Sequence, residues 1–149
     1  MTNFSKLFTL THAQRLFEEW EQHKKIIIGV DYDDTISPWR TTPQEICNLV
    51  IKEIIRSQKV GAFIVIHTAC DPSRYMEIRE YCNKVGIKVD SINQNPIDLP
   101  YGTAERSKIF ANIFLDDRGG LGEALTILKM ARDTYFNKYI AYNQQETEI

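Results

Sequence analysis

An unbroken apolar run that ends in acidic residues is the feature that most constrains this chain. Residues 26–30 read Ile-Ile-Ile-Gly-Val, and Asp31, Asp33 and Asp34 follow directly. A short β-branched run with no polar break is typical of a strand buried on both faces, as in parallel sheets. Carboxylates at the C-terminal end of such a strand stand where open α/β sheets bind ligands. Because closely spaced carboxylates repel one another, the stretch predicts a site for a divalent cation and a phosphate.

The composition is that of one domain of modest charge. The sequence has 149 residues, is 43% hydrophobic and carries a formal net charge of -2. These values suit a single domain over residues 1–149 and exclude a broad basic surface for duplex nucleic acid. The cysteines Cys47, Cys70 and Cys82 form no Cys-x-x-Cys pair, as is typical of reduced thiols. Since the chain shows neither a signal-peptide core nor a run near the ~20 apolar residues of a membrane span, we expect a cytoplasmic protein with no membrane partner.

Helical and strand patterns alternate along the chain. This alternation predicts an α/β fold, a Rossmann-like three-layer sandwich around a mainly parallel sheet of four or five strands. Residues 1–25 are expected to hold an extension (1–10) and a helix with a capping box at Thr11, residues 26–131 the core, and residues 132–149 a C-terminal helix or tail. The expected core elements are strands at 26–30, 60–67, 87–92 and 109–115, a helix at 43–58 capped by Thr42, a helix capped by Asp71 and stopped by Gly86, and a helix from 121.

The last helix has two interpretations. Its apolar residues recur at spacings of three, four and seven, which favours a helix running well past residue 132. The alternative is a helix that stops near Thr134 and is followed by a short fifth strand at 139–142. The periodicity slightly favours the long helix.

Polar groups follow several of the expected strands. Asp31 and Asp33 follow the first strand, Thr68 ends the second, Lys108 precedes the last, and the pair Asp116-Asp117 follows it. In a parallel sheet the C-terminal ends of all strands lie at one edge, so these residues are expected to converge. Each has an ordinary structural explanation when taken alone, in a turn, a helix cap or a solvated side chain. Their order and placement together predict a site.

This arrangement resembles the haloacid dehalogenase (HAD) superfamily of phosphatases and phosphotransferases. The first motif of that superfamily is an apolar strand followed by Asp-x-Asp-x-Thr, as at residues 31–35. The second is a Ser or Thr ending the next strand, matched by Thr68, and the third is a Lys, matched by Lys108. The fourth is an acidic pair after another apolar strand, matched by Asp116-Asp117. The resemblance covers about residues 26–130. Three other cations compete for the third motif: Lys84, Lys88 and Arg106.

The resemblance implies a covalent route for phosphate transfer. Asp31 would attack phosphorus and form an aspartyl-phosphate, which divides a slow hydrolysis into two easier steps. Asp33 would protonate the leaving oxygen and then deprotonate the water that releases phosphate. Thr68 and Lys108 would hold the oxygens of the transferring group. The expected activity is therefore that of a phosphomonoester hydrolase.

The resemblance also implies a magnesium ion. Its ligands would be the carboxylates of Asp31 and Asp116, the backbone carbonyl of Asp33, and waters. Asp117 would act on the ion through a water molecule. The ion would neutralise the charge that repels the nucleophile from the phosphate.

Two departures from the usual pattern of the superfamily stand out. Asp34 occupies a position where members more often have Gly, which puts an additional acid at the catalytic turn. The intervals after the first and second motifs are too short for a cap domain. A capless HAD-like domain has an open site, which suits macromolecular ends or a lid borrowed from a loop or a second subunit, and a homodimer is therefore a reasonable expectation.

The substrate is the least constrained prediction. Trp39 and Arg40 follow the first motif, and an aromatic beside an arginine could stack on a base and hold a phosphate. An equally good interpretation is that Trp39 packs on its own loop and Arg40 is solvated. The capless layout resembles the phosphatase part of polynucleotide end-processing enzymes and the small nucleotidases. This points to a phosphorylated small molecule such as a nucleotide, or to a nucleic-acid end. Further candidates for anion contact are Arg74, Arg106 and Arg118.

Three other functions share parts of this pattern. A phosphorylation-controlled receiver domain would carry its acidic pair after the first strand, whereas here the pair comes last. A calcium loop would need Gly where Ile36 stands and a bidentate acid where Thr42 stands, so it is excluded. The remaining alternative is a binding or scaffolding protein of the same fold with weak catalysis or none, which the intact set of motif residues disfavours.

Overall fold

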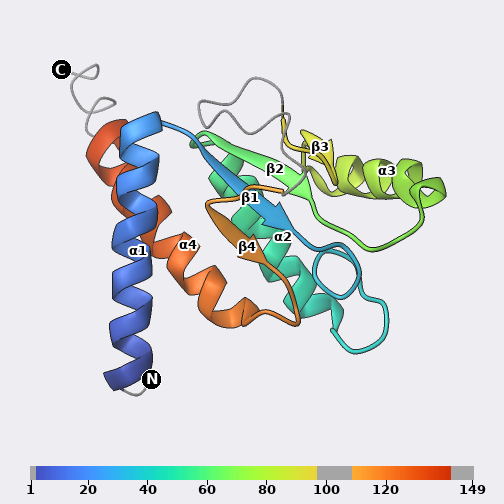
Figure 1. Cartoon of the computed structure of the whole chain (residues 1–149), viewed down its shortest axis with the longest axis horizontal. Helices are drawn as coiled ribbons and strands as arrows, with labels where there is room; N and C mark the ends of the chain where they lie inside the picture. The colour runs from blue at the N-terminus through green and yellow to red at the C-terminus, as the bar shows by residue number, and fades with distance from the viewer. Residues whose placement is uncertain (1–2, 97–108, 142–149) are drawn as a thin grey trace.

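The computed structural model describes residues 3–96 and 109–141 (Figure 1). Helices and strands alternate around one sheet, which confirms the α/β class. The helices are α1 (Asn3–His23), α2 (Gln44–Gln58), α3 (Tyr75–Val85) and α4 (Leu121–Tyr135), with a short 3-10 helix η1 (Pro72–Arg74) before α3 and a π-helix η2 (Phe136–Ala141) after α4. The strands are β1 (Ile26–Val30), β2 (Ala62–Ile66), β3 (Ser91–Ile92) and β4 (Ile113–Leu115).

The four described strands form one sheet in the order β3-β2-β1-β4, and every pairing is parallel. The register places Val30 of β1 beside Ile66 of β2 and Leu115 of β4, so these three strands end level. Backbone hydrogen bonds extend the ladder by one residue, from the Asp31 N–H to the Leu115 carbonyl (2.9 Å) and from the His67 N–H to the Val30 carbonyl (2.7 Å). The polar residues that follow the strands therefore start from one edge of the sheet.

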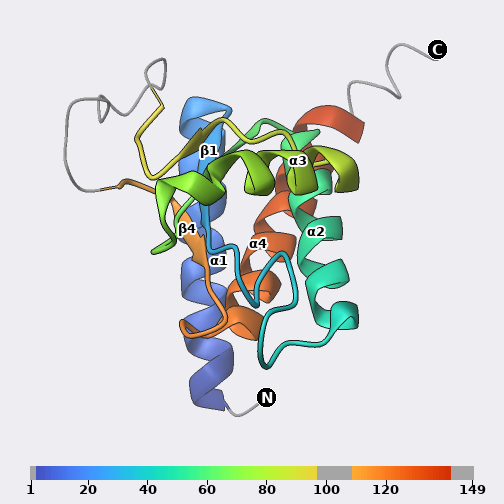
Figure 2. The same cartoon turned by 90° about the vertical axis from the view of Figure 1, so that its right-hand side faces the viewer.

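The described helices all contribute to the same core, on one face of the sheet. Figure 2 shows α2 and α4 together on this side. This core joins β1 and β2 to one side chain or more from each helix, including Leu16, Val50, Ile78 and Leu128.

On the other face, Ile27 and Val65 are fully buried against Phe63 and residues 109–111, and no helical residue of the described chain joins this cluster. The described residues thus form two of the three expected layers, the sheet and the helices on one face. The other face is covered by the segment before β4 in place of helices.

The helix α1 begins at Asn3, so the expected extension over residues 1–10 and the capping box at Thr11 are wrong for the described residues. Thr11 lies inside the helix, where its hydroxyl donates to the Leu7 carbonyl at 2.8 Å. A hydroxyl bonded to the carbonyl four residues earlier is compatible with a helix interior. Packing of α1 along α4 (Figure 1) stabilises a helical segment whose own pattern of apolar residues did not predict one.

Trp20 fixes α1 to the rest of the molecule. Its side chain is fully buried, its indole Nε1 donates to the Val60 carbonyl at 3.0 Å, and its ring stacks on Tyr135 with centres 5.4 Å apart. Nearer the start of α1, four apolar side chains are exposed: Phe4, Leu7, Phe8 and Leu10. The homodimer expected from the open site stays a prediction.

Several element ends differ from the sequence-based expectation. The helix α2 has Pro43 as its N-cap residue without a side-chain cap, so the cap expected at Thr42 is wrong. The physical reason is that the Thr42 N–H donates to the carboxylate of Asp34, which holds Thr42 in the preceding loop. The strands β3 and β4 are shorter than expected. In the segment before β4, residues 109–111 pack on the second face of the sheet.

Other helix ends agree with the sequence-based expectation. Asp71 accepts the Ser73 N–H at 2.9 Å and opens η1, and Gly86 ends α3 with a φ of 96° that favours glycine. The helix α4 continues into η2 as far as Ala141, which favours the long helix over a strand at 139–142. None of the described helices is both long and apolar enough to cross a membrane.

The intervals that could hold a cap domain are partly described. Residues 31–43 between β1 and α2 form a loop without a helix or strand. The second interval contains η1, α3 and β3, and residues 97–108 lie outside the described residues. The first interval is thus a loop, and the expected absence of a cap domain stays a prediction.

Candidate functional site

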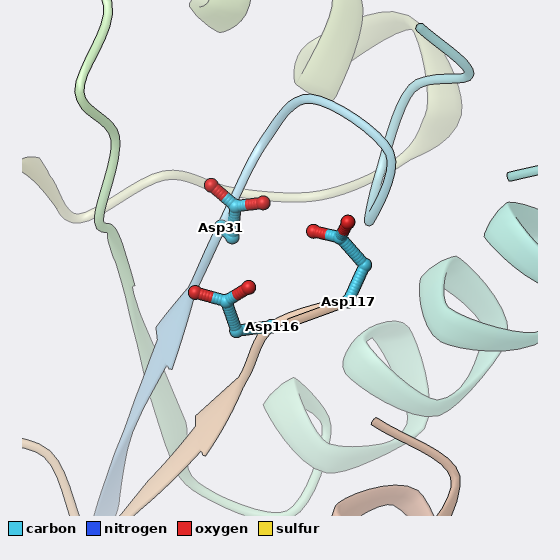
Figure 3. A group of neighbouring side chains, drawn as sticks. All are labelled: Asp31, Asp116 and Asp117. Carbon is cyan, nitrogen blue, oxygen red and sulfur yellow. The ribbon is translucent and has the colours of Figure 1, made fainter. Parts of the chain in front are cut away.

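Three carboxylates meet at the C-terminal edge of the sheet (Figure 3). Asp31 follows β1, and Asp116 and Asp117 follow the neighbouring strand β4. Figure 3 shows the three side chains turned toward one another, and one oxygen from each lies within 4.8 Å of the others. Residues separated by 85 positions in the sequence are thus brought together by the parallel pairing of β1 with β4. The convergence expected for Asp31 and the acidic pair is present.

A buried hydroxyl links two of these acids. Thr35 is fully buried, and its Oγ1 accepts the Asp117 N–H at 3.1 Å. The same Oγ1 lies 3.2 Å from Asp31 Oδ2 and 3.3 Å from Asp117 Oδ1, so its single proton can be donated to one of these carboxylates at a time. Thr35 therefore links the turn after β1 to the acidic pair that follows β4.

The close approach of the acids has an electrostatic cost. Partial burial, the hydrogen bond with Asp117 and the charge of Asp116 raise the pKa of Asp31 to about 7. A cation among the oxygens would remove this cost, because it favours the ionised carboxylates. Carboxylate oxygens at this spacing suit a hard divalent cation. The three acids could thus hold a metal ion.

Asp33 turns away from this group and forms an ion pair with Arg74 of η1. Arg74 Nη1 donates to Asp33 Oδ2 at 3.0 Å, and Nη2 donates to Oδ1 at 3.2 Å. Both side chains are about one-quarter exposed. The carboxylate of Asp33 therefore contributes no oxygen to the group around Asp31, and a metal contact from Asp33 would have to come from its backbone carbonyl.

Asp34 has a structural role in the turn that follows β1. Its φ is 63°, in the left-handed region, and one carboxylate oxygen accepts four backbone N–H groups from residues 39–42 at 2.9–3.1 Å. Burial alone would raise the pKa of Asp34, but these four donors outweigh it and hold the pKa well below its ordinary value. The additional acid thus organises the loop that carries Trp39 and Arg40, in addition to any effect on the local field.

A pocket of about 560 Å³ opens beside these acids. Its lining includes three arginines, Arg40, Arg74 and Arg118, together with His67 and Cys70. Every expected site residue that the structure describes also lines it: Asp31, Asp33, Trp39, Arg40, Thr68, Asp116 and Asp117.

Thr68 is held at the pocket wall by Asn93, which follows β3. The Thr68 N–H donates to Asn93 Oδ1 at 2.9 Å, and Asn93 Nδ2 donates to the Thr68 carbonyl at 2.7 Å and to the Tyr75 hydroxyl at 2.8 Å. The Thr68 hydroxyl accepts the Cys70 N–H at 3.2 Å, which leaves its proton able to bond an anion in the pocket. Asn93 has a φ of 54°, a conformation that Asn tolerates better than most residues.

Trp39 stands at the pocket between two arginines. The guanidinium carbon of Arg74 lies 5.2 Å from the Trp39 ring centre, and that of Arg40 lies 6.0 Å away. More than half of the Trp39 side chain is exposed. Trp39 thus packs on arginines of its own chain and still presents surface to the pocket, and its stacking on a base stays a prediction.

The expected third-motif lysine, Lys108, lies outside the described residues, and so does its competitor Arg106. Of the other two competitors, neither Lys84 nor Lys88 lines the pocket. Lys88 is well exposed and lies 3.9 Å from Asp90. The assignment to Lys108 stays a prediction.

Sequence reasoning gave Asn93 no role and Arg74 only a general one. Arg74 was one of several arginines named for anion contact, but its pairing with Asp33 joins residues 41 positions apart. The sequence signal available for Arg74 was its position four residues after Cys70, in the turn that follows the second strand. No pattern marked Asn93, whose role depends on the pairing of β3 with β2.

Comparison with known proteins adds nothing to this geometry. No family model, curated protein or solved structure matches this chain.

Proposed function

We propose that this chain is a HAD-like, magnesium-dependent phosphomonoester hydrolase that acts through an aspartyl-phosphate. The observation that carries the proposal is the meeting of Asp31 with Asp116 and Asp117 at the wall of a pocket that Asp33 and Thr68 also line. These are the residue types of the HAD motifs in the HAD order. A parallel sheet with its polar residues at one edge supports this assignment.

The chemistry proceeds in two displacements. A carboxylate oxygen of Asp31 attacks phosphorus, the bond from phosphorus to the leaving oxygen breaks, and Asp33 donates a proton to that oxygen. Asp33 then accepts a proton from a water molecule, whose oxygen attacks the same phosphorus. The phosphorus–oxygen bond to Asp31 breaks, inorganic phosphate leaves, and the carboxylate of Asp31 is restored. Net hydrolysis consumes one water molecule.

The residues present fit a magnesium ion. Asp31 and Asp116 would supply carboxylate oxygens and Asp33 its backbone carbonyl, while Asp117 would act through water. When bound, magnesium neutralises charge on the carboxylates and on the phosphate. Thr35 keeps Asp31 and Asp117 at a fixed spacing through its hydroxyl. Thr68 donates its hydroxyl proton to a phosphate oxygen, and Lys108 is assigned the same task.

The substrate is a nucleotide or a nucleic-acid terminal phosphate. The pocket volume of about 560 Å³ falls within the range of roughly 300–1,000 Å³ that is usual for ligand sites. Trp39 offers an exposed ring for a base, and Arg40 lies beside it for an anionic group. The loop between β1 and α2 leaves the pocket without a cap over it on that side.

Phosphate release from an aryl phosphate tests the proposal directly. The expected result is turnover that requires magnesium and falls at least about 1,000-fold in Asp31→Asn, because this variant lacks the nucleophile. Asp133→Asn is the matched control, since Asp133 lies in α4 outside the pocket, and it is expected to keep the wild-type rate. Magnesium binding without turnover on aryl phosphates, nucleotides and phosphorylated oligonucleotides would contradict the proposal and favour the binding protein.

A further inference from the structure

Both carboxylate oxygens of Asp33 are occupied by Arg74. The guanidinium donates to one oxygen at 3.0 Å and to the other at 3.2 Å. The proposed function requires Asp33 to contact the leaving oxygen of a substrate and then a water molecule. Each carboxylate oxygen keeps a second lone pair, so these contacts can form in this arrangement, but they must compete with a bidentate guanidinium. A different partner for Arg74 would remove this competition.

Arg74 is held in place independently of Asp33. Its Nη2 also donates to Glu77 at 3.3 Å, and its guanidinium lies 5.2 Å from the ring centre of Trp39. These contacts keep the side chain at the pocket wall when the bonds to Asp33 open. A guanidinium fork fits the paired oxygens of a phosphate as well as those of a carboxylate. An anionic group in the pocket can therefore replace Asp33 on Arg74.

The phosphate group that is hydrolysed is not the anion that we expect to replace Asp33 as the partner of Arg74. It must lie beside Asp31 and Thr68, whose groups are assigned to hold it. Arg74 lies with Arg40 at Trp39, and all these residues line the same pocket. The pocket thus has cationic groups at Trp39 in addition to the groups that surround the reacting phosphorus. A second anionic group on the substrate would match them.

We propose that this site, given the proposed function, selects phosphomonoesters that carry a second anionic group, and that Arg74 binds this group and thereby releases Asp33. The class includes phosphorylated oligonucleotide ends, whose neighbouring phosphodiester supplies the second charge, and sugar bisphosphates. Substrates with one phosphate leave Arg74 on Asp33 and react slowly. Arg74 is thus a specificity-determining residue that acts on the reaction by freeing Asp33.

The test compares kcat/KM within two matched substrate pairs. One pair is thymidine 5′-monophosphate and the 5′-phosphorylated thymidine dinucleotide, and the other is a hexose monophosphate and the corresponding hexose bisphosphate. The wild-type protein is expected to prefer the member with the second charge by at least about 10-fold in one pair, the effect of one charge-assisted contact. The pair that shows the preference identifies the source of the second anion.

Variants of Arg74 separate this role from a structural one. In Arg74→Gln the preference is expected to fall to about one, because kcat/KM for the substrate with the second charge falls more than kcat/KM for the monophosphate. A merely structural role would lower both rates together. Arg74→Lys keeps the charge without the fork and is expected to keep only part of the preference. Arg79→Gln is the control, since Arg79 lies in α3 outside this pocket.

A wild-type protein that treats both members of each pair alike would overturn this inference while leaving the proposed function intact, as long as phosphate is released. An Arg74→Gln protein with the full wild-type preference would overturn it as well. Failure of the wild-type protein to release phosphate from any substrate would contradict the proposed function and this inference with it. If Arg74→Gln does not fold, the wild-type ratios and Arg74→Lys decide.

Discussion

At the scale of single residues, Asp34 lies three positions after the proposed nucleophile, Asp31. Its carboxylate stabilises the backbone of a loop and has no proposed role in the chemistry. One of its oxygens accepts four N–H groups of the loop that carries Trp39 and Arg40. We expect Asp34→Ala to lower Tm and to weaken substrate binding, and Asp34→Asn to do less harm because its amide oxygen still accepts hydrogen bonds. Thermal unfolding followed by circular dichroism ranks the two variants. An equal loss of Tm in both variants would contradict the role of Asp34 as the acceptor that organises this loop.

The lowered pKa of Asp34 also predicts how the stability of the folded protein depends on pH. Its pKa is lowered in the folded protein, so its contribution to stability is present above the ordinary value of 3.8 and is lost as the pH falls through the lower folded value. The difference in Tm between the wild-type protein and Asp34→Ala should therefore stay constant from neutral pH to about pH 4 and shrink below it. Melting curves between pH 2 and pH 7 provide the measurement. A difference that grows on acidification would refute this assignment.

Substitutions at Thr35 test the role of a single hydroxyl, which is fully buried between Asp31 and Asp117. Thr35→Val keeps the shape and removes the hydroxyl, which leaves the Asp117 N–H without its acceptor. This is expected to cost about 1–3 kcal/mol of the free energy of unfolding and to weaken metal binding. Thr35→Ser retains the hydroxyl and should keep metal affinity. Denaturant unfolding and magnesium titration of both variants measure the two effects, and equal magnesium affinity in the valine and serine variants would contradict the proposed link.

At the scale of elements, α1 is part of the core although it lies outside the expected motifs. Trp20→Ala is expected to lower the free energy of unfolding by about 3–5 kcal/mol, because it removes a fully buried ring, and Trp20→Phe by about 1–2 kcal/mol, because it mainly loses the bond to Val60. Val60 precedes β2, at the edge of the sheet opposite the site. Folded Trp20→Phe should therefore keep the magnesium response of the wild-type protein in thermal unfolding. Loss of that response would contradict the separation of α1 from the site.

The elements also show what sequence reasoning could and could not recover. The strand at 26–30 and its acids were predictable because a short β-branched run has few alternatives and its C-terminal end must lie at the ligand edge of a parallel sheet. The first residues of α1 were not, since their helix depends on packing against α4 more than on its own pattern. The pair of Arg74 with Asp33 was also beyond reach, because it depends on where η1 lies relative to the turn after β1.

At the scale of the whole molecule, we expect metal binding and pH to be coupled through Asp31. Its pKa is raised to about 7 in the metal-free protein, so its contribution to stability is present below the ordinary pKa of 3.8 and is lost as the pH rises through about 7. A cation competes with the proton on this carboxylate, and its affinity should fall up to about 10-fold per pH unit below 7.

Magnesium is therefore expected to raise Tm more at pH 8 than at pH 6. Differential scanning fluorimetry at both pH values, with and without the ion, measures this difference. Asp31→Asn should abolish it. An equal rise in Tm at the two pH values would contradict the coupling.

The claim on which the account depends is that Asp31 becomes covalently phosphorylated. Rapid acid quenching with a substrate that carries radioactive phosphate, followed by peptide mapping, tests it most directly. The account predicts label on the peptide that contains Asp31, released by hydroxylamine as expected for an acyl phosphate, and no label in Asp31→Asn. Magnesium-dependent turnover by the wild-type protein at a rate that quenching can follow, with no label on the protein at any time, would contradict it.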